Sequence, residues 1–129
     1  MRVALFALAL CAAMPAAAQE PARPNLLHRQ TVTGMPRGEQ QEVQVLTATI
    51  APGQATVFHT HRHPVTVYML NGAFTLEMEG HAPVTVSAVQ SMVEPPNVRM
   101  TGYNRDAEPV RLVIFYVSEP GAPFLDPIH

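Results

Sequence analysis

The sequence has little that could cross-link the chain or attract a polyanion. Its 129 residues include one cysteine, Cys11, no tryptophan and no lysine. A single cysteine cannot form an internal disulfide bond. Nucleic acids and anionic membrane surfaces bind clustered positive charge, and the scattered arginines form no cluster that could supply it. These absences exclude a disulfide scaffold and argue against nucleic acid or a membrane surface as a partner.

The first 18 residues have the pattern of a secretory signal peptide. Arg2 supplies a positive start, residues 3–14 are almost entirely apolar, and Ala16 to Ala18 provide a small-residue cleavage site. The apolar stretch is too short to span a membrane. We therefore expect an exported protein, periplasmic or secreted, with no membrane segment once residues 1–18 are removed. The mature chain then has seven arginines against ten acidic residues, a formal net charge of −3.

The remaining residues divide into an arm and a domain. Residues 19–40 contain scattered prolines and glycines without a regular period, which predicts an extended arm. Residues 41–129 contain short runs of β-branched and aromatic residues separated by glycine and proline, which predicts one β-barrel domain.

The pattern within these runs is that of strands with one buried face. Phe74, Leu76 and Met78 alternate with polar residues, so they share one face. Asn71-Gly72 between two runs is typical of a type I′ hairpin turn. Together the runs predict an all-β fold, a sandwich or barrel. The eight predicted strands are residues 43–50, 56–63, 65–70, 73–79, 84–86, 91–94, 98–103 and 110–117.

Three histidines occupy alternate positions in one run, at His59, His61 and His63. Alternate residues of a strand share one face, and neutral imidazole is a good ligand for zinc, copper, iron and nickel. Pro64 follows directly and ends or bends the strand, so alternation supports His63 less than the other two. The run predicts a metal site, with a solvated histidine-rich edge as the alternative.

The chain resembles the cupin superfamily in this region. Gly53, His59, His61 and Gly72 are spaced like the first cupin motif, which begins G-x5-H-x-H, and residues 95–104 resemble the second motif. The resemblance extends over roughly residues 45–117. It implies a small jelly-roll barrel of about eight strands in which both motifs converge on one interior metal site. It also implies a homodimer and a small-molecule ligand or substrate.

Two departures from the cupin motifs affect the predicted metal. The position of the family's glutamate ligand holds Val65 or Thr66, and the family's last histidine falls on Met100. Methionine fills irregular cores easily, so core packing is one interpretation of Met100. The other is a ligand, because a thioether is a soft, neutral donor suited to Cu(I).

A metal site of His59, His61 and Met100, with His63 replacing the lost glutamate, has no charged ligand. Such a site favours copper, with zinc or iron as alternatives. Glu94 precedes a Pro-Pro turn, and we expect it to be a solvated loop carboxylate rather than an acid or base at the barrel mouth.

Three functions stay open at this point. The first is a metal-dependent oxygenase or related enzyme that acts on a small organic molecule. The second is a periplasmic protein that holds or passes copper without turnover. The third is a metal-free barrel that binds a small molecule. No catalytic residue is assigned, because no triad order, phosphate loop or cysteine pair is present.

Overall fold

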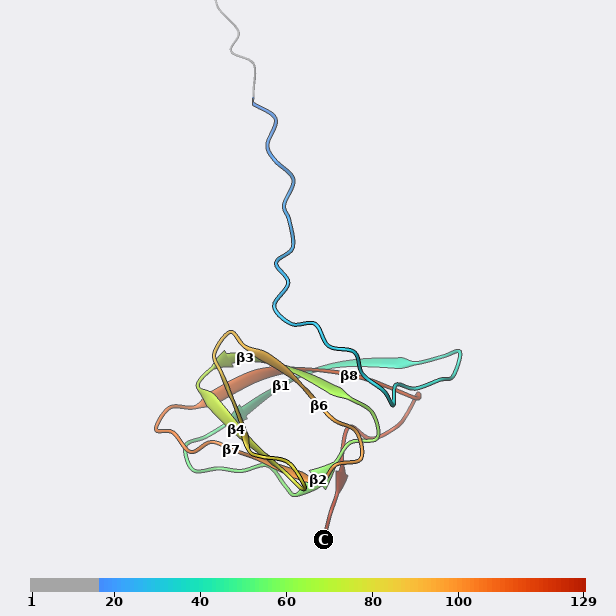
Figure 1. Ribbon diagram of the computed structural model, residues 1–129, viewed down its shortest axis with the longest axis vertical. Helices are drawn as coiled ribbons and strands as arrows, with labels where there is room; N and C mark the ends of the chain where they lie inside the picture. The colour runs from blue at the N-terminus through green and yellow to red at the C-terminus, as the bar shows by residue number, and fades with distance from the viewer. Residues whose placement is uncertain (1–16) are drawn as a thin grey trace, which may run out of the picture.

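The computed structural model describes residues 17–129, and within them nine strands form two antiparallel sheets that face each other (Figure 1). The four-stranded sheet has the order β1-β8-β3-β6 and the five-stranded sheet the order β5-β4-β7-β2-β9. The all-β fold is therefore confirmed. The strands are β1 (Glu42–Ile50), β2 (His59–Thr60), β3 (Val65–Asn71), β4 (Ala73–Met78), β5 (Val84–Ser87), β6 (Ser91–Glu94), β7 (Met100–Tyr103), β8 (Val110–Ser118) and β9 (Asp126–Pro127).

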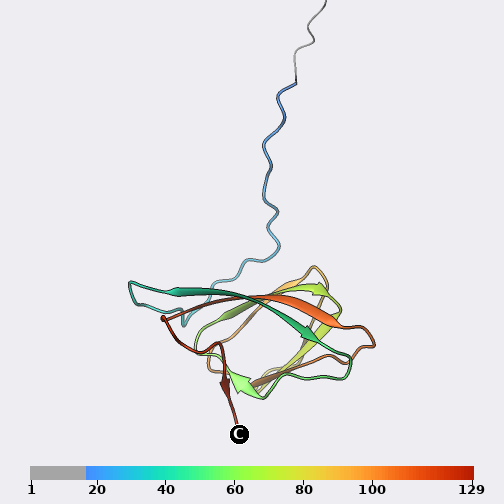
Figure 2. The same ribbon diagram turned by 180° about the vertical axis from the view of Figure 1, so that it is seen from behind.

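Residues 17–41 contain no strand and reach the barrel from one side, whereas the chain ends on the opposite side (Figures 1 and 2). Most of the predicted signal peptide, residues 1–16, lies outside the described residues. In the part of the chain that the structure does describe, no helix has the length and apolar character needed to cross a membrane.

The core lies between the two sheets and follows from the period-two pattern. In β8, every second side chain from Val110 to Ser118 is buried, and the intervening residues are exposed or half-buried. β1 pairs with β8 along its whole length, from Glu42 opposite Ser118 to Ile50 opposite Val110. Alternation sends one set of side chains inward from each strand. The buried apolar residues are Ile50, Val65, Val67, Met69, Phe74, Leu76, Met78, Val86, Met100, Val110, Leu112, Ile114 and Tyr116.

The turn at Asn71-Gly72 is not a hairpin. It joins β3 to β4, and these strands belong to different sheets. Gly72 has a φ of 78°, and a Cβ atom at this position would lie 2.8 Å from the carbonyl oxygen of Pro109. Glycine is thus required for the backbone angle and the close approach at a corner between sheets, which the sequence pattern does not distinguish from a hairpin.

The strand that contains the histidines is shorter than predicted. Only His59 and Thr60 pair with neighbours, with β7 on one side and β9 on the other. The chain then bends before Pro64, and the carbonyl oxygen of His61 accepts a hydrogen bond from the amide of Asn97, 2.7 Å away, outside the strand ladder. Strand alternation therefore stops at His61.

We expect Gly102→Ala to destabilise the fold. A Cβ at Gly102 would lie 2.1 Å and 2.3 Å from ring carbons of the buried Phe74, so the ring has to move. Overpacking of this kind costs about 1–3 kcal/mol of unfolding free energy, measurable by urea denaturation. Phe74→Leu makes room, so the Gly102→Ala change should cost clearly less in that background. Equal costs in both backgrounds would contradict the assigned contact.

Candidate metal centre

Two of the predicted metal ligands meet inside the barrel. His59 lies in β2 and His61 follows it directly, and their exposed fractions are 5% and 1%. Their Nε2 atoms are 3.0 Å apart, and the rings stand nearly perpendicular, at 78°. The i, i+2 spacing thus brings these two imidazoles together on the inner face, as strand alternation predicts.

The other nitrogen of each ring is held by a backbone carbonyl group. His59 Nδ1 lies 2.6 Å from the carbonyl oxygen of Val57, and His61 Nδ1 lies 2.7 Å from that of Phe124. A carbonyl oxygen can only accept, so each Nδ1 donates its proton. In the neutral rings both Nε2 atoms are then unprotonated, and two lone pairs face each other across 3.0 Å. This arrangement requires a cation or a shared proton.

Glu94 brings a carboxylate to the same place. Its side chain is buried, with the residue 5% exposed, and its Oε2 lies 3.2 Å from His61 Nε2. The expectation of a solvated loop residue is wrong, because Glu94 is the last residue of β6 and pairs with Val65 of β3, so it faces inward. A buried carboxylate costs free energy unless positive charge or a donor compensates it. It therefore adds to the demand for a cation.

The electrostatics around His59 favour its neutral imidazole. Burial lowers the pKa of His59, and the neighbouring His61 lowers it further, against the raising effects of the Val57 hydrogen bond and of Glu94. His59 therefore keeps its free lone pair at a lower pH than an exposed histidine does.

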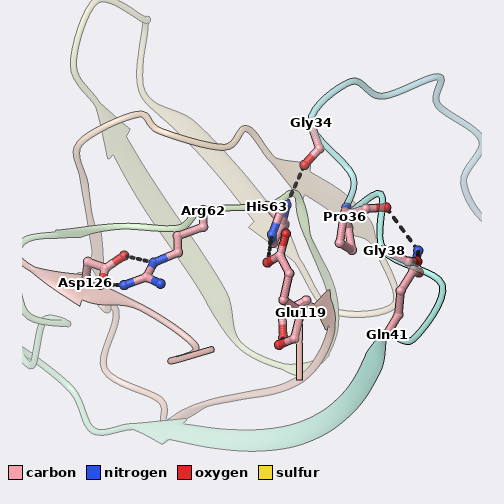
Figure 3. Close-up of polar contacts among 9 residues, drawn as sticks. Gly34, Pro36, Gly38, Gln41, Arg62, His63, Glu119 and Asp126 are labelled. Atoms are coloured by element: carbon pink, nitrogen blue, oxygen red, sulfur yellow. Dashed lines mark hydrogen bonds and ion pairs between the residues drawn. The ribbon is translucent and has the colours of Figure 1, made fainter. Parts of the chain in front are cut away.

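His63 does not join the pair. Its Nδ1 lies 2.6 Å from the carbonyl oxygen of Gly34, and its Nε2 lies 2.6 Å from Oε2 of Glu119 (Figure 3). The expectation that three imidazoles share one face is thus wrong, because the bend before Pro64 ends the alternation. Although burial lowers it, the hydrogen bonds to Gly34 and Glu119 raise the pKa of His63 overall. This histidine connects the N-terminal arm to the end of β8.

Met100 lies beside His59. The two residues are direct cross-strand neighbours in β7 and β2, and Met100 is fully buried. Directly opposed residues share a face of the sheet. Met100 also lies opposite Met78 of β4, so its position is that of a core residue as well as of a ligand.

The described residues contain no group of three or more His, Cys, Asp and Glu side chains already arranged to hold a metal ion. A metal ion bound by the imidazole pair would therefore draw its next protein ligand from Glu94 or Met100 through a change of side-chain rotamer. Glu94 Oε2 lies 3.2 Å from His61 Nε2, and Met100 is the cross-strand neighbour of His59.

A cavity of about 120 Å³ adjoins the pair. His59, His61 and Glu94 form its polar end. Phe124 and Leu125, from the segment after β8, form part of its lining. The remaining walls are mainly apolar, with Thr56 as their one polar residue: Ala48, Ile50, Thr56, Val67, Phe74, Leu76, Leu112 and Ile114.

Tyr116 is a further residue near the site that the sequence pattern did not indicate. Its ring packs against Phe124, with centroids 5.4 Å apart, and lies 6.1 Å from the His61 ring. Its hydroxyl is buried and has no hydrogen-bond partner among the described residues. Burial raises the pKa of Tyr116. In the sequence it is one of several alternating apolar positions of a long strand, so only the fold reveals its place.

The sequence profile of the Cupin domain matches residues 46–116, more than half of the chain. The chain is a member of the cupin family. The match includes His59, His61, Glu94 and Met100 and agrees with the resemblance of the two motifs. Curated proteins offer no significant match to this sequence.

Solved structures share the cupin fold. An RmlC-like cupin with a double-stranded β-helix fold from Methanocaldococcus jannaschii is 22% identical, with a TM-score of 0.54 over 60% of this chain and 70% of that chain. A protein with a double-stranded β-helix domain from Klebsiella pneumoniae is 19% identical, with a TM-score of 0.58. The match covers 78% of this chain and 90% of that chain. A cupin-like protein from Thermotoga maritima is 18% identical, with a TM-score of 0.55. The match covers 67% of this chain and 64% of that chain. The two sheets of this chain therefore form a double-stranded β-helix.

We expect His63→Leu to loosen the arm of this cupin. The change removes both side-chain hydrogen bonds of His63, to the Gly34 carbonyl and to the Glu119 carboxylate, and each such bond contributes about 0.5–1.5 kcal/mol. Trypsin should then cleave after Arg37 several-fold faster, as followed by mass spectrometry. His81→Leu is the control, because His81 is exposed and bonds only within its own turn. Equal cleavage rates in both variants would contradict an anchoring role for His63.

Proposed function

We propose that this protein is an exported cupin that binds a transition-metal ion at His59 and His61 and a small organic molecule in the adjoining cavity. One observation carries the proposal: the Nε2 atoms of His59 and His61 face each other at 3.0 Å in the barrel interior, while each Nδ1 lies within hydrogen-bond distance of a backbone carbonyl oxygen. The partial negative charges of the two ring nitrogens repel each other at this distance. A cation bound between them would attract both nitrogens.

The surroundings of the two rings support a ligand role. Metal-binding histidines almost always donate their other ring proton to a carbonyl or carboxylate, which fixes the tautomer. Val57 and Phe124 supply such carbonyl groups here. Ligand atoms that share one ion at about 2.0–2.2 Å lie about 3.0–3.5 Å apart. The Nε2 pair at 3.0 Å and the Glu94 oxygen at 3.2 Å from His61 fall in this range.

Glu94 changes the preferred metal. The sequence favoured copper because no carboxylate was expected at the site, yet Glu94 is buried beside His61. Two imidazoles and one carboxylate suit zinc and iron(II). We therefore infer a site of His59, His61 and Glu94. Copper is the second candidate, supported by the buried Met100 opposite His59.

A bound ion would act as a Lewis acid toward an oxygen atom of the ligand. A redox-active ion would in addition be able to react with dioxygen. The chain's own residues supply the rest of the site. His59 and His61 hold the ion, the apolar walls limit water, and Glu94 can hold a proton at Oε2 when it is not a ligand. An enzyme and a metal carrier share this geometry, and oxygen consumption or substrate turnover by the loaded protein separates them.

We expect metal affinity to depend on the imidazole pair. The mature chain, stripped with a chelator, is titrated with Zn(II), Fe(II), Cu(I) and Cu(II), and at least one ion should bind with submicromolar Kd. His61→Ala should lower that affinity more than about tenfold, because removing even a residue that only supports a metal ligand typically lowers metal affinity by about 10–100-fold. His81→Ala provides the matched control on the exposed side. Binding weaker than about 10 µM for all four ions, or equal loss in both variants, would contradict the proposal.

Glu94→Gln and Met100→Leu separate the two candidate metal sites. Glu94→Gln should weaken Zn(II) or Fe(II) binding at least tenfold and change Cu(I) binding little, since the amide is a poorer ligand for hard ions. Met100→Leu should have little effect on zinc and iron and should cost under about 1.5 kcal/mol of stability, like its neighbour control Met78→Leu. Loss of Cu(I) binding only in Met100→Leu would instead identify the copper site. Unchanged affinity for every ion in both variants would contradict both.

A further inference from the structure

The cavity beside His59 and His61 has one polar end, and all its polar groups there are acceptors. The Nε2 atoms of His59 and His61 carry free lone pairs, and the buried Glu94 carboxylate lies next to them. While both rings are neutral and share no proton, none of these three groups donates to a ligand, and the Thr56 hydroxyl in the same lining already donates to the Val57 carbonyl. A molecule that enters the metal-free cavity therefore needs a donor group at this point to satisfy the acceptors.

The remaining walls exclude charge and limit size. Among the described residues, the cavity lining contains no arginine, and the chain has no lysine, so an anion finds no positive partner apart from a metal. The carboxylate of Glu94 repels an anion further. The volume of about 120 Å³ is somewhat smaller than that of an engineered apolar cavity known to bind benzene, which measures about 150 Å³.

We propose that this cavity binds a compact, uncharged, mainly apolar molecule that carries one hydroxyl group. The hydroxyl points toward His59, His61 and Glu94, and the apolar body packs against the side chains of both sheets. A hydroxyl suits both states of the site, because it donates to the acceptors without metal and offers a lone pair to an ion when metal is present. Only this second state rests on the metal site of the proposed function; ligand binding to the metal-free cavity does not depend on that metal site.

The C-terminal strap, residues 120–129, contributes Phe124 and Leu125 to the lining of this cavity. The carbonyl of Phe124 accepts from His61, and the Phe124 ring lies 4.7 Å from the His61 ring. Beyond it, Asp126 forms two hydrogen bonds of 2.9 Å with the guanidinium of Arg62 (Figure 3), and the amide of Ile128 donates to the Phe58 carbonyl. Phe124 and Leu125 thus form one wall of the ligand site, and the proposal places the entry route at this strap.

The strap also connects ligand entry to the imidazole pair. His61 uses one ring nitrogen for the site and the other for the strap. Strap displacement removes the carbonyl that holds the His61 proton on Nδ1. Phe124 is consequently a positioning residue for His61 as well as a wall of the cavity.

The test compares four probes in the stripped protein and in the Zn(II)-loaded protein by calorimetry and ligand-detected NMR. Phenol should bind both forms at millimolar Kd or better. Its near-isostere toluene, which lacks the hydroxyl, should bind at least about tenfold more weakly than phenol. Benzoate should not bind the stripped protein, and 2-naphthol should be too large for either form. Toluene binding as well as phenol, or benzoate binding the stripped protein, would overturn the proposal.

Two variants test whether the probe occupies this cavity. Ala48→Leu, which adds volume to a cavity-lining position, should reduce phenol affinity at least tenfold, whereas Thr47→Leu on the opposite face of β1 should not. Phe124→Ala removes the roof and should admit 2-naphthol, and its site in the strap leaves the barrel sheets intact. Equal phenol binding by Ala48→Leu and Thr47→Leu, with both folded by near-UV circular dichroism, would place the probe elsewhere and overturn the proposal.

The strap has its own kinetic test. Asp126→Asn breaks the pairing with Arg62, and phenol should then associate and dissociate several-fold faster. Glu77→Gln breaks a comparable exposed ion pair, with Arg105, away from the cavity and should leave both rates unchanged. Equal rates in the two variants would overturn the strap as the entry route.

Phenol binding without metal binding would contradict the proposed function alone, and metal binding without phenol binding would contradict this cavity proposal alone.

Discussion

The contact between the Nε2 atoms of His59 and His61 is the constraint on which the rest of the site depends. Each ring is fixed by a proton shared with a carbonyl group, from Val57 for one and from Phe124 for the other. The resulting pair of lone pairs, with Glu94 beside it, is unfavourable without a cation or proton. The interior of this barrel therefore contains a group of acceptor atoms that lacks a compensating positive charge, which an ordinary apolar core does not have.

The fold provides this arrangement from parts that are far apart in the sequence. Glu94 is oriented inward by the β3–β6 ladder, and Phe124 comes from the strap after the last long strand. His63, only two residues from His61, is bonded to Gly34 and Glu119 instead. The same short segment thus contributes one histidine to the proposed metal centre and fastens the N-terminal arm with another.

Much of the fold could be predicted from the sequence because alternation is a local property. Runs such as Phe74, Leu76 and Met78 indicate their buried face directly, and the spacing of His59, His61 and Gly72 resembles a motif that the cupin profile confirms. The failures have physical causes. The bend before Pro64 breaks the alternation that His63 required, and Asn71-Gly72 turns between sheets instead of within one.

The place of Glu94 and of the strap could not be predicted from local pattern. Glu94 ends a four-residue strand next to a Pro-Pro turn, and its burial depends on which strand lies opposite. β9 has two residues, Asp126 and Pro127, and no apolar alternation, so nothing in the sequence marks it as a strand. Only the pairing with β2 brings Phe124 onto the cavity and completes the surroundings of His61.

The most direct test of the central claim is the ¹⁵N chemical shift of the ring nitrogens of His59 and His61, recorded before and after Zn(II) addition. The account predicts that both neutral rings carry the proton on Nδ1, and that both Nε2 signals shift together and saturate at one equivalent of zinc. A stable proton on either Nε2, shared with Glu94 or with the other ring, together with signals that do not respond to zinc, would contradict it.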